Sequence, residues 1–409
     1  MLIHHRYWLA PSTLLLLWSA APAWAQKDEP VFQLNAGYSL LTDSNPRRVP
    51  AGTEDQIGTT TLGFNFSTRQ SLQQFELDLN LIDYKYQNFD HLNFTARNYN
   101  AAWRWALTPR MHGNLTSDRR ESLNSYFINT DQKDSPESST EVPGVLRTNT
   151  NTRFDGVYEL DGVWRVLGGV STSKLTSDQT DSTAPVSGTD AEVNSADMGL
   201  RYAFTSGNAL TYTARTSHGN YLNDGTFNES FSQRDNELRL HWILTGNTTA
   251  DISAAHISRT HPDARLDYSG LNTGVKLNWN ITGKTALAAG WMRELTSDRH
   301  DAGADSYNYN STHVRTNRFS LGPVWKASAK TVVRLNYEVA QRDYQGSPTG
   351  LDAATQRSDT LRNISLAVAW QPYKHVTLGA SLQKATRTSN VVNLDYGSNM
   401  ATVSAQFSY

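Results

Sequence analysis

The sequence has no cysteine among its 409 residues. A lipoprotein needs a cysteine at its cleavage site, and a small secreted scaffold needs several to form disulfides, so both classes are excluded. The sequence also has no large excess of charge of either sign. It contains 37 basic and 39 acidic residues, which gives a net charge of -2. Without a basic excess, the composition gives no indication of a nucleic-acid partner.

Long apolar runs are also scarce. The most apolar stretch, LLLLWSAAP, lies between Arg6 and the sequence Ala23-Trp24-Ala25. A positive charge, a short apolar run and an A-x-A site are typical of a cleaved secretory signal. The run is far shorter than the ~20 residues that a spanning helix needs. We therefore expect residues 1–25 to be removed on export, and residues 26–409 to form a single domain without a membrane-spanning helix.

The apolar residues that are present follow a period of two. Hydrophobic residues make up only 38% of the chain, less than a soluble domain of this length needs for its core. In the segment DTLRNISLAVAWQ, Ile364, Leu366, Val368 and Trp370 alternate with polar or small residues. Similar segments recur along the sequence, and no helical period interrupts them. This alternation predicts long β-strands with one apolar and one polar face.

Aromatic residues mark regularly spaced strand ends, each followed by a short polar turn. We place these ends at Phe66, Trp105, Tyr158, Tyr202, Trp242, Trp279, Trp325, Trp370 and Tyr409. Each interval holds two long strands, which predicts about eighteen strands, or sixteen if the weak end near Tyr158 is misread. The short turns are expected near residues 67–72, 108–110, 161–162, 205–208, 245–247, 282–284, 328–330 and 372–375.

An outer-membrane barrel accounts for this pattern better than other all-β folds. A β-propeller needs four short strands per repeat, and a soluble sandwich does not gather its short connections at one end. Outer-membrane barrels combine short periplasmic turns, longer outer loops and strands that are apolar toward lipid and polar toward the lumen. The expected fold is therefore an all-β, transmembrane, antiparallel up-and-down barrel in the outer membrane of a Gram-negative bacterium, with both termini periplasmic.

The repeated tryptophans are interpreted as an aromatic girdle. Aromatic rings gather where lipid meets water, because each has an apolar body and a polar edge. The expected girdle consists of Trp105, Trp242, Trp279, Trp325 and Trp370. A track of sugar-stacking rings along a pore is the alternative, but these residues share the parity of Leu, Ile and Val. The C-terminal strand ends with Phe407 and Tyr409, which is similar to the signal read by the barrel-assembly machinery.

Charged residues on the opposite parity are expected to line the lumen. Against lipid, an Arg or Lys at the membrane midplane costs roughly 2 to 4 kcal/mol. The predicted lumen-lining residues are Arg104, Arg201, Arg239, Lys276, Arg318, Arg334, Glu76, Asp78 and Glu338. Two interpretations stay open for them: salt bridges that merely fill the barrel, or the wall of a hydrated conduit.

The sequence lacks the motifs that are typical of catalytic, metal-binding and phosphate-binding sites. The histidines have no H-x-x-x-H spacing, and the sequence contains neither a nucleophile-elbow glycine pattern nor a phosphate-binding loop. We therefore predict no catalytic residues, no metal site and no cofactor.

Several segments together resemble one family. SLLTDSNPRRVP, FDHLNFTARNYNAAWRWALTPR, SDRRESLNSYF, QRDYQG and DTLRNISLAVAWQP are similar to the EpsL-type outer-membrane proteins of exopolysaccharide biosynthesis loci, which accompany exosortase and PEP-CTERM sorting systems. The resemblance extends from about residue 31 to the C-terminus. It departs from the family where Pro46 and Arg47 follow Asn45. It implies a barrel that takes part in the export of a secreted polysaccharide.

Three functions follow from these observations. The first is a polar conduit for an exopolysaccharide, which would require a periplasmic partner to deliver the polymer. The alternatives are a general or substrate-specific uptake porin and a structural or adhesive barrel with a plugged lumen. In each case the expected partners include outer-membrane lipid, lipopolysaccharide and the barrel-assembly machinery, and exclude nucleic acid.

Overall fold

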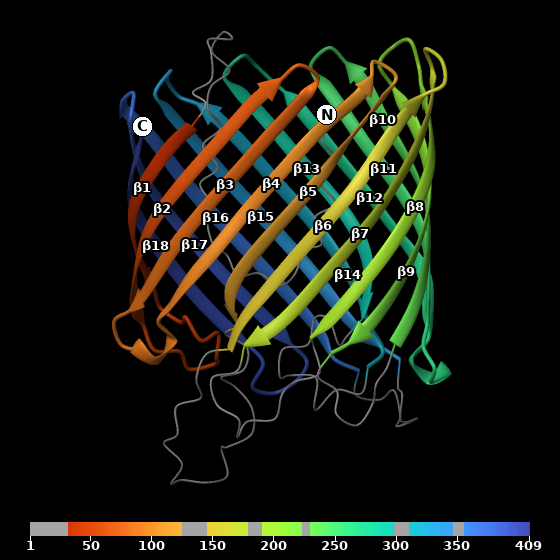
Figure 1. Ribbon diagram of the computed structural model, residues 1–409. Helices are drawn as coiled ribbons and strands as arrows, with labels where there is room; N and C mark the ends of the chain where they lie inside the picture. Colours follow the sequence, from red (N-terminus) through yellow and green to blue (C-terminus); the bar gives the residue numbers. More distant parts are fainter. Residues whose placement is uncertain (1–31, 125–144, 179–189, 223–229, 298–310, 347–355) are drawn as a thin grey trace.

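The computed structural model describes residues 32–124, 145–178, 190–222, 230–297, 311–346 and 356–409. These residues form one antiparallel sheet of 18 strands that closes into a barrel (Figure 1). The strands are β1 (Phe32–Asp43), β2 (Asp55–Gln70), β3 (Gln73–Tyr86), β4 (Phe94–Thr108), β5 (Met111–Asn124), β6 (Val145–Glu159), β7 (Trp164–Asp178), β8 (Ala191–Ala203), β9 (Ala209–Tyr221), β10 (Ser230–Thr245), β11 (Thr248–Thr260), β12 (Tyr268–Asn280), β13 (Thr285–Ser297), β14 (His313–Lys326), β15 (Thr331–Gln345), β16 (Ser358–Tyr373), β17 (Val376–Ser389) and β18 (Tyr396–Ser408). The predicted barrel of eighteen strands is confirmed.

Each strand pairs with the strand before it and the strand after it. The ring closes where β1 pairs with β18, with Asn35 opposite Ser408 and Asp43 opposite Met400. Leu34 and Tyr409 exchange two backbone hydrogen bonds of 2.8 Å at the end of this seam. Closure leaves no unpaired sheet edge, which is the condition for strands to cross a lipid bilayer.

All the short turns lie at one rim of the barrel, the upper rim in Figure 1. The turn predicted at residues 67–72 is shorter in the structure, because β2 continues to Gln70 and only Ser71 and Leu72 connect it to β3. The other predicted turns agree with the observed ones to within about two residues. Several of these turns begin with a small polar side chain that accepts a hydrogen bond from the backbone N–H two residues later. The residues that do so are Thr108, Asp161, Thr245, Thr282 and Ser328. This turn chemistry explains why a small polar residue follows the aromatic end of so many strands.

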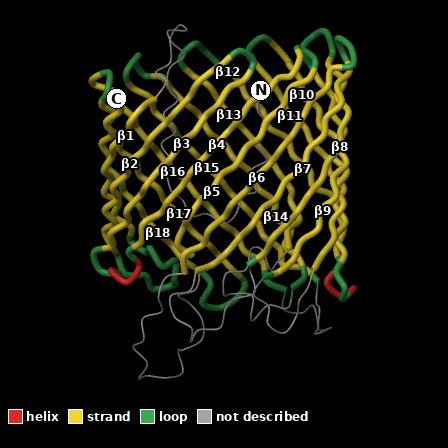
Figure 2. Tube along the Cα trace, viewed as in Figure 1, coloured by secondary structure: helices red, strands yellow, loops and turns green. Residues whose placement is uncertain are grey.

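The longer connections lie at the opposite rim, together with two short 3-10 helices, η1 (Asp90–Leu92) and η3 (Ala264–Leu266), drawn in red in Figure 2. In the connection that contains η3, the Arg265 guanidinium and backbone N–H hold the pKa of Asp263 at about 2. The predicted signal sequence, residues 1–25, lies outside the described residues. No described helix is long and apolar enough to span a membrane.

The apolar residues cover the outside of the barrel instead of forming a central core. Leu382 is 63% exposed and Val403 is 59% exposed, and most large apolar side chains of the strands share their face. Such an apolar surface is far larger than a water-soluble monomer exposes, and it matches the lipid-facing band of outer-membrane barrels. The low apolar content therefore reflects a barrel whose apolar residues face outward.

Candidate functional site: the charged inner wall

The polar face of the sheet is the inner wall of the barrel. The Arg153 guanidinium on β6 makes two hydrogen bonds, of 2.6 and 3.0 Å, with the Asp197 carboxylate on β8. Strands β6 and β8 are separated by β7, a span of roughly 10 Å. The next residue along β6, Phe154, points to the opposite face, which carries the exposed large apolar side chains of the barrel surface. The residues that share the parity of Arg153 therefore line the lumen.

Arg153 reaches Asp197 by crossing a glycine. Gly169 on β7 pairs with Asp155 on one side and with Asp197 on the other. A Cβ atom added at Gly169 would lie 2.5 Å from the Arg153 guanidinium. The absence of a side chain thus creates the path for the ion pair. Arg215 on β9 also approaches Asp197, at 3.7 Å, so two guanidinium groups share one carboxylate.

Several predicted lumen cations are neutralised by neighbouring carboxylates. Arg104 lies 2.7 Å from Glu76, and Arg239 lies 2.6 Å from Glu237. Arg318 lies 3.4 Å from Glu338. The predicted carboxylate Asp78 accepts a hydrogen bond from the Asn65 amide. These residues fit the interpretation of charges that balance one another across the wall.

Three other predicted lumen cations are not neutralised by a described carboxylate. Within the described ranges, Arg201 on β8, Lys276 on β12 and Arg334 on β15 form no ion pair. Each lies within a few residues of a short turn: Arg201 precedes the end of β8, Lys276 precedes the end of β12, and Arg334 follows the start of β15. Because the short turns define one rim, the three cations lie at a similar level around the wall. Arg201 also pairs in register with a further inner-wall cation, Arg165.

Near the other rim, the inner wall is aromatic and carries stacked guanidinium groups. Arg259 lies 3.9 Å from the Phe231 ring centroid, and Arg387 lies 5.1 Å from that of Tyr396. Arg357 stacks on Tyr344 and forms a 2.7 Å ion pair with Asp359.

A second group of inner-wall residues is apolar and consists of Ile57, Ile82, Tyr84 and Ala96. Sequence reasoning assigned only polar residues to this wall and missed both groups. The positions of these aromatic and apolar residues, at the same parity as the polar inner-wall residues, could have predicted that they face the lumen.

The first long connection is fixed to the closing seam. The Asp43 carboxylate pairs with Arg48 at 2.8 Å and accepts a 2.6 Å hydrogen bond from the Ser398 hydroxyl on β18. The Asn45 amide donates to the carbonyl oxygens of Val49 and Gly397. The segment TDSNPRR therefore holds β1 against β18, which gives the residues around Asn45 a structural role.

The predicted girdle residues lie on the outer face, but one of them is covered. Trp242, Trp279, Trp325 and Trp370 are each between 42% and 53% exposed. Trp105 is only 7% exposed, because its ring lies over Gly113 and stacks on Phe154 with a centroid distance of 5.6 Å. Trp105 has the outward parity expected of a girdle residue, and its ring also packs against neighbouring residues of the barrel. Gly113 and Gly156, which pair in register, have no side chains and so make the space for the ring.

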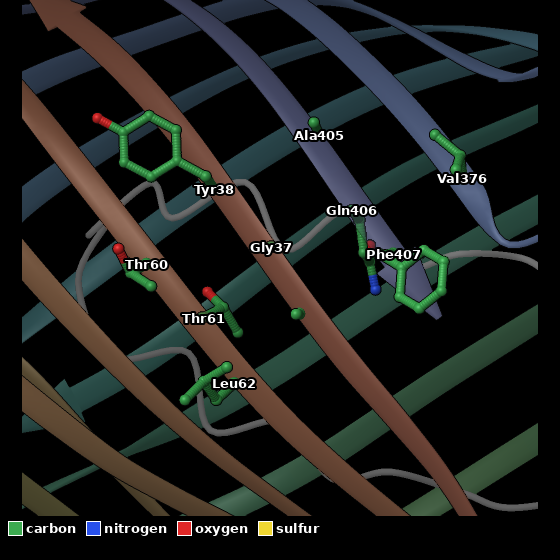
Figure 3. A pocket seen from close by; sticks show the side chains of 10 residues that line it. Gly37, Tyr38, Thr60, Thr61, Leu62, Val376, Ala405, Gln406 and Phe407 are labelled. Atoms are coloured by element: carbon green, nitrogen blue, oxygen red, sulfur yellow. The ribbon is translucent and has the colours of Figure 1, made fainter. Parts of the chain in front are cut away.

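A shallow hollow lies over the closing seam (Figure 3). Tyr38, Leu62 and Phe407 surround the small residues Gly37 and Ala405, and Tyr38 and Leu62 belong to the outward parity. The hollow belongs to the lipid-facing surface and not to the lumen. In the ranges that the structure describes, no group of His, Cys, Asp or Glu residues is arranged to hold a metal ion.

No protein-family model and no curated protein matches the sequence. Solved structures of Pseudomonas aeruginosa barrels are similar in fold. OpdK, crystallised with vanillate, has a TM-score of 0.50 and 14% identity, over 92% of this chain and 99% of that chain. OccK9 (OpdG) has a TM-score of 0.51 and 13% identity, over 92% of this chain and 98% of that chain. OccK3 (OpdO) has a TM-score of 0.50 and 14% identity, over 92% and 95%.

This similarity shows the fold, which is that of outer-membrane barrel porins. It does not extend to the EpsL-type family, whose resemblance rests on the sequence segments alone.

Proposed function

We propose that the protein is an outer-membrane channel of the porin type that admits small acidic solutes. The observation that carries this proposal is the set of inner-wall cations without an ion pair, Arg201, Lys276 and Arg334. A guanidinium or ammonium group already bound to a carboxylate has little capacity for a solute. An unpaired one offers charge-assisted hydrogen bonds to a carboxylate or phosphate.

The arrangement of the wall also favours passage over retention. A channel must bind its solute strongly enough to admit it and weakly enough to release it. The three cations lie on separate strands, β8, β12 and β15, so a small solute meets them singly. Carboxylates such as Glu76 and Glu338 are already engaged by Arg104 and Arg318 and repel an acidic solute only weakly. The barrel of OpdK was crystallised with vanillate, a carboxylate, which is consistent with this chemistry.

Solute entry into vesicles tests the proposal. Liposomes that contain the folded protein should swell faster in a small aromatic carboxylate than in a neutral sugar of similar size. Replacing the three cations by glutamine (Arg201→Gln, Lys276→Gln and Arg334→Gln) should remove most of this preference. The matched control is Arg234→Gln, Arg362→Gln and Lys384→Gln, which removes the same charge from the outer face. An equal loss of preference in the control would refute the role of the inner-wall cations, and no swelling at all would refute the channel.

Participation in exopolysaccharide export is the second candidate. It is favoured by the segments that resemble the EpsL-type family, and a polymer of acidic sugars would meet the same cations. A deletion strain distinguishes the two functions. Loss of surface polysaccharide with persisting intracellular precursors would favour export. Normal polymer together with slower uptake of an acidic solute would favour the porin. We propose no catalytic step for either function.

A further inference from the structure

We propose that the outer face carries a binding surface for the phosphate groups of outer-leaflet lipid, centred on Arg362 of β16 and Lys384 of β17. The inference concerns the outside of the barrel. It requires the membrane location of the proposed function but not its solute. It begins with the distribution of charge along the outward parity of the strands.

The outer face has a charge-free band. Up to about six residues from the aromatic strand ends, no outward-facing residue of the described strands is Asp, Glu, Lys or Arg. The first outward charges on β17 and β16 are Lys384, opposite Ile364, and Arg362. From Trp370 to Arg362, eight residues of a tilted strand rise by roughly 20 Å, which is close to the ~25 Å height of the apolar band in outer-membrane barrels. Trp370 and Arg362 thus mark its two boundaries.

Cations collect at the boundary nearer the long connections. The outward cations there that form no ion pair with a described carboxylate are Arg97, Lys174, Arg234, Arg293, Arg362 and Lys384. A cation at this level extends along the wall toward the headgroups. The side with long connections is the outer-leaflet side in such barrels.

Arg362 and Lys384 form the densest part of this surface. Arg362 pairs in register with Thr386, and Lys384 pairs with Ile364 and Asn399, so the two cations are diagonal neighbours on adjacent strands. Such positions lie about 7–8 Å apart, within reach of one ligand for two long side chains. Both side chains are exposed, and the hydroxyl of Thr386 and the amide of Asn399 supply further polar contacts. Two cations with hydrogen-bonding neighbours suit a lipid phosphate.

The contrast with Arg119 supports the assignment. Arg119 lies on the outer face at a comparable level of β5, but Glu121 of the same strand neutralises it. Some outward cations are therefore neutralised by a carboxylate of the barrel. Arg362 and Lys384 form no ion pair with a described carboxylate, so both can bind a lipid phosphate.

Binding of lipid A to the folded, purified barrel tests the proposal. Each cation near anionic lipid strengthens binding by roughly a factor of five, so Arg362→Gln with Lys384→Gln should weaken binding of bisphosphorylated lipid A about 25-fold. Lipid A without phosphates should bind wild type and variant alike, and excess inorganic phosphate should not displace the lipid.

Arg201→Gln with Lys276→Gln is the matched control, because it removes one arginine and one lysine from the inner wall. A shift in gel mobility on heating verifies that each variant is folded. Wild-type affinity in the outer-face variant, or an equal loss in the inner-wall variant, would overturn the proposal.

Discussion

At the scale of single residues, the inner wall depends on a position where a side chain is missing. The ion pair between Arg153 and Asp197 crosses β7 only because residue 169 is a glycine. Its neighbour Gly168 faces outward, and a Cβ atom there would meet nothing closer than 3.9 Å. A side chain at residue 169 would thus collide with the Arg153 guanidinium, whereas a side chain at residue 168 would have room.

We therefore expect Gly169→Ala to destabilise the barrel by about 2 kcal/mol, because it displaces a guanidinium that makes charge-assisted hydrogen bonds. Gly168→Ala should change the free energy of unfolding by less than about 0.5 kcal/mol. Urea titration in lipid vesicles measures both. In a double-mutant cycle, Gly169→Ala should add little to Arg153→Ala. If the losses of unfolding free energy in the two variants were fully additive, Gly169 would not act through the Arg153 ion pair.

Trp105 shows a similar dependence on missing side chains. Its ring is buried against Gly113 and Phe154, whereas Trp370 is 48% exposed at the same rim. Trp105→Ala should cost about 3 to 5 kcal/mol of stability, the range for truncating a buried aromatic. Trp370→Ala should cost clearly less. Refolding titrations of the two variants in the same lipid provide the comparison, and equal costs would contradict the packing role of Trp105.

At the scale of the strand, the alternation of faces determines which substitutions are tolerated. Leu366 faces outward within the charge-free band, and Arg239 faces inward next to Glu237. Leu366→Arg should cost roughly 2 to 4 kcal/mol because it places a charge against lipid. Arg239→Ala should cost less than about 1 kcal/mol, because a partly exposed ion pair contributes little. Similar costs at both positions in lipid vesicles would invalidate the assignment of faces.

The last strand has two separable roles. The backbone of Tyr409 bonds to Leu34 across the seam, and its ring lies 5.8 Å from that of His375. Tyr409→Ala keeps the backbone bonds, so the purified variant should refold in lipid almost as well as wild type. If Phe407 and Tyr409 form an assembly signal, the same variant should reach the outer membrane at several-fold lower abundance in cells. Normal abundance in cells would exclude that signal.

At the scale of the whole molecule, the fold was largely predictable from the sequence. The alternation in strands such as β16, and the aromatic end with a small polar turn, predicted the strand number and the position of the short turns to within a few residues. Both signals are local, since side chains alternate along a strand and turn residues bond to their own backbone.

The partners of the wall residues were not predictable in the same way. Arg153 and Asp197 are 44 residues apart, and their ion pair depends on the register of three strands and on the glycine between them. The same limit applies to Trp105, whose burial depends on Gly113 of the next strand, and to the aromatic residues near the other rim. Parity predicts that a side chain faces the lumen, but it does not predict which neighbour neutralises it.

The ion selectivity of a single barrel shows whether free cations line a channel. In a planar bilayer with a salt gradient, we expect a conducting barrel whose reversal potential indicates anion preference. Arg201→Gln with Lys276→Gln and Arg334→Gln should move that potential toward cation preference. The outer-face control (Arg234→Gln with Arg362→Gln and Lys384→Gln) should leave it unchanged. A barrel that passes no current, or one whose selectivity is unaffected by the inner-wall substitutions, would contradict a channel lined by free cations.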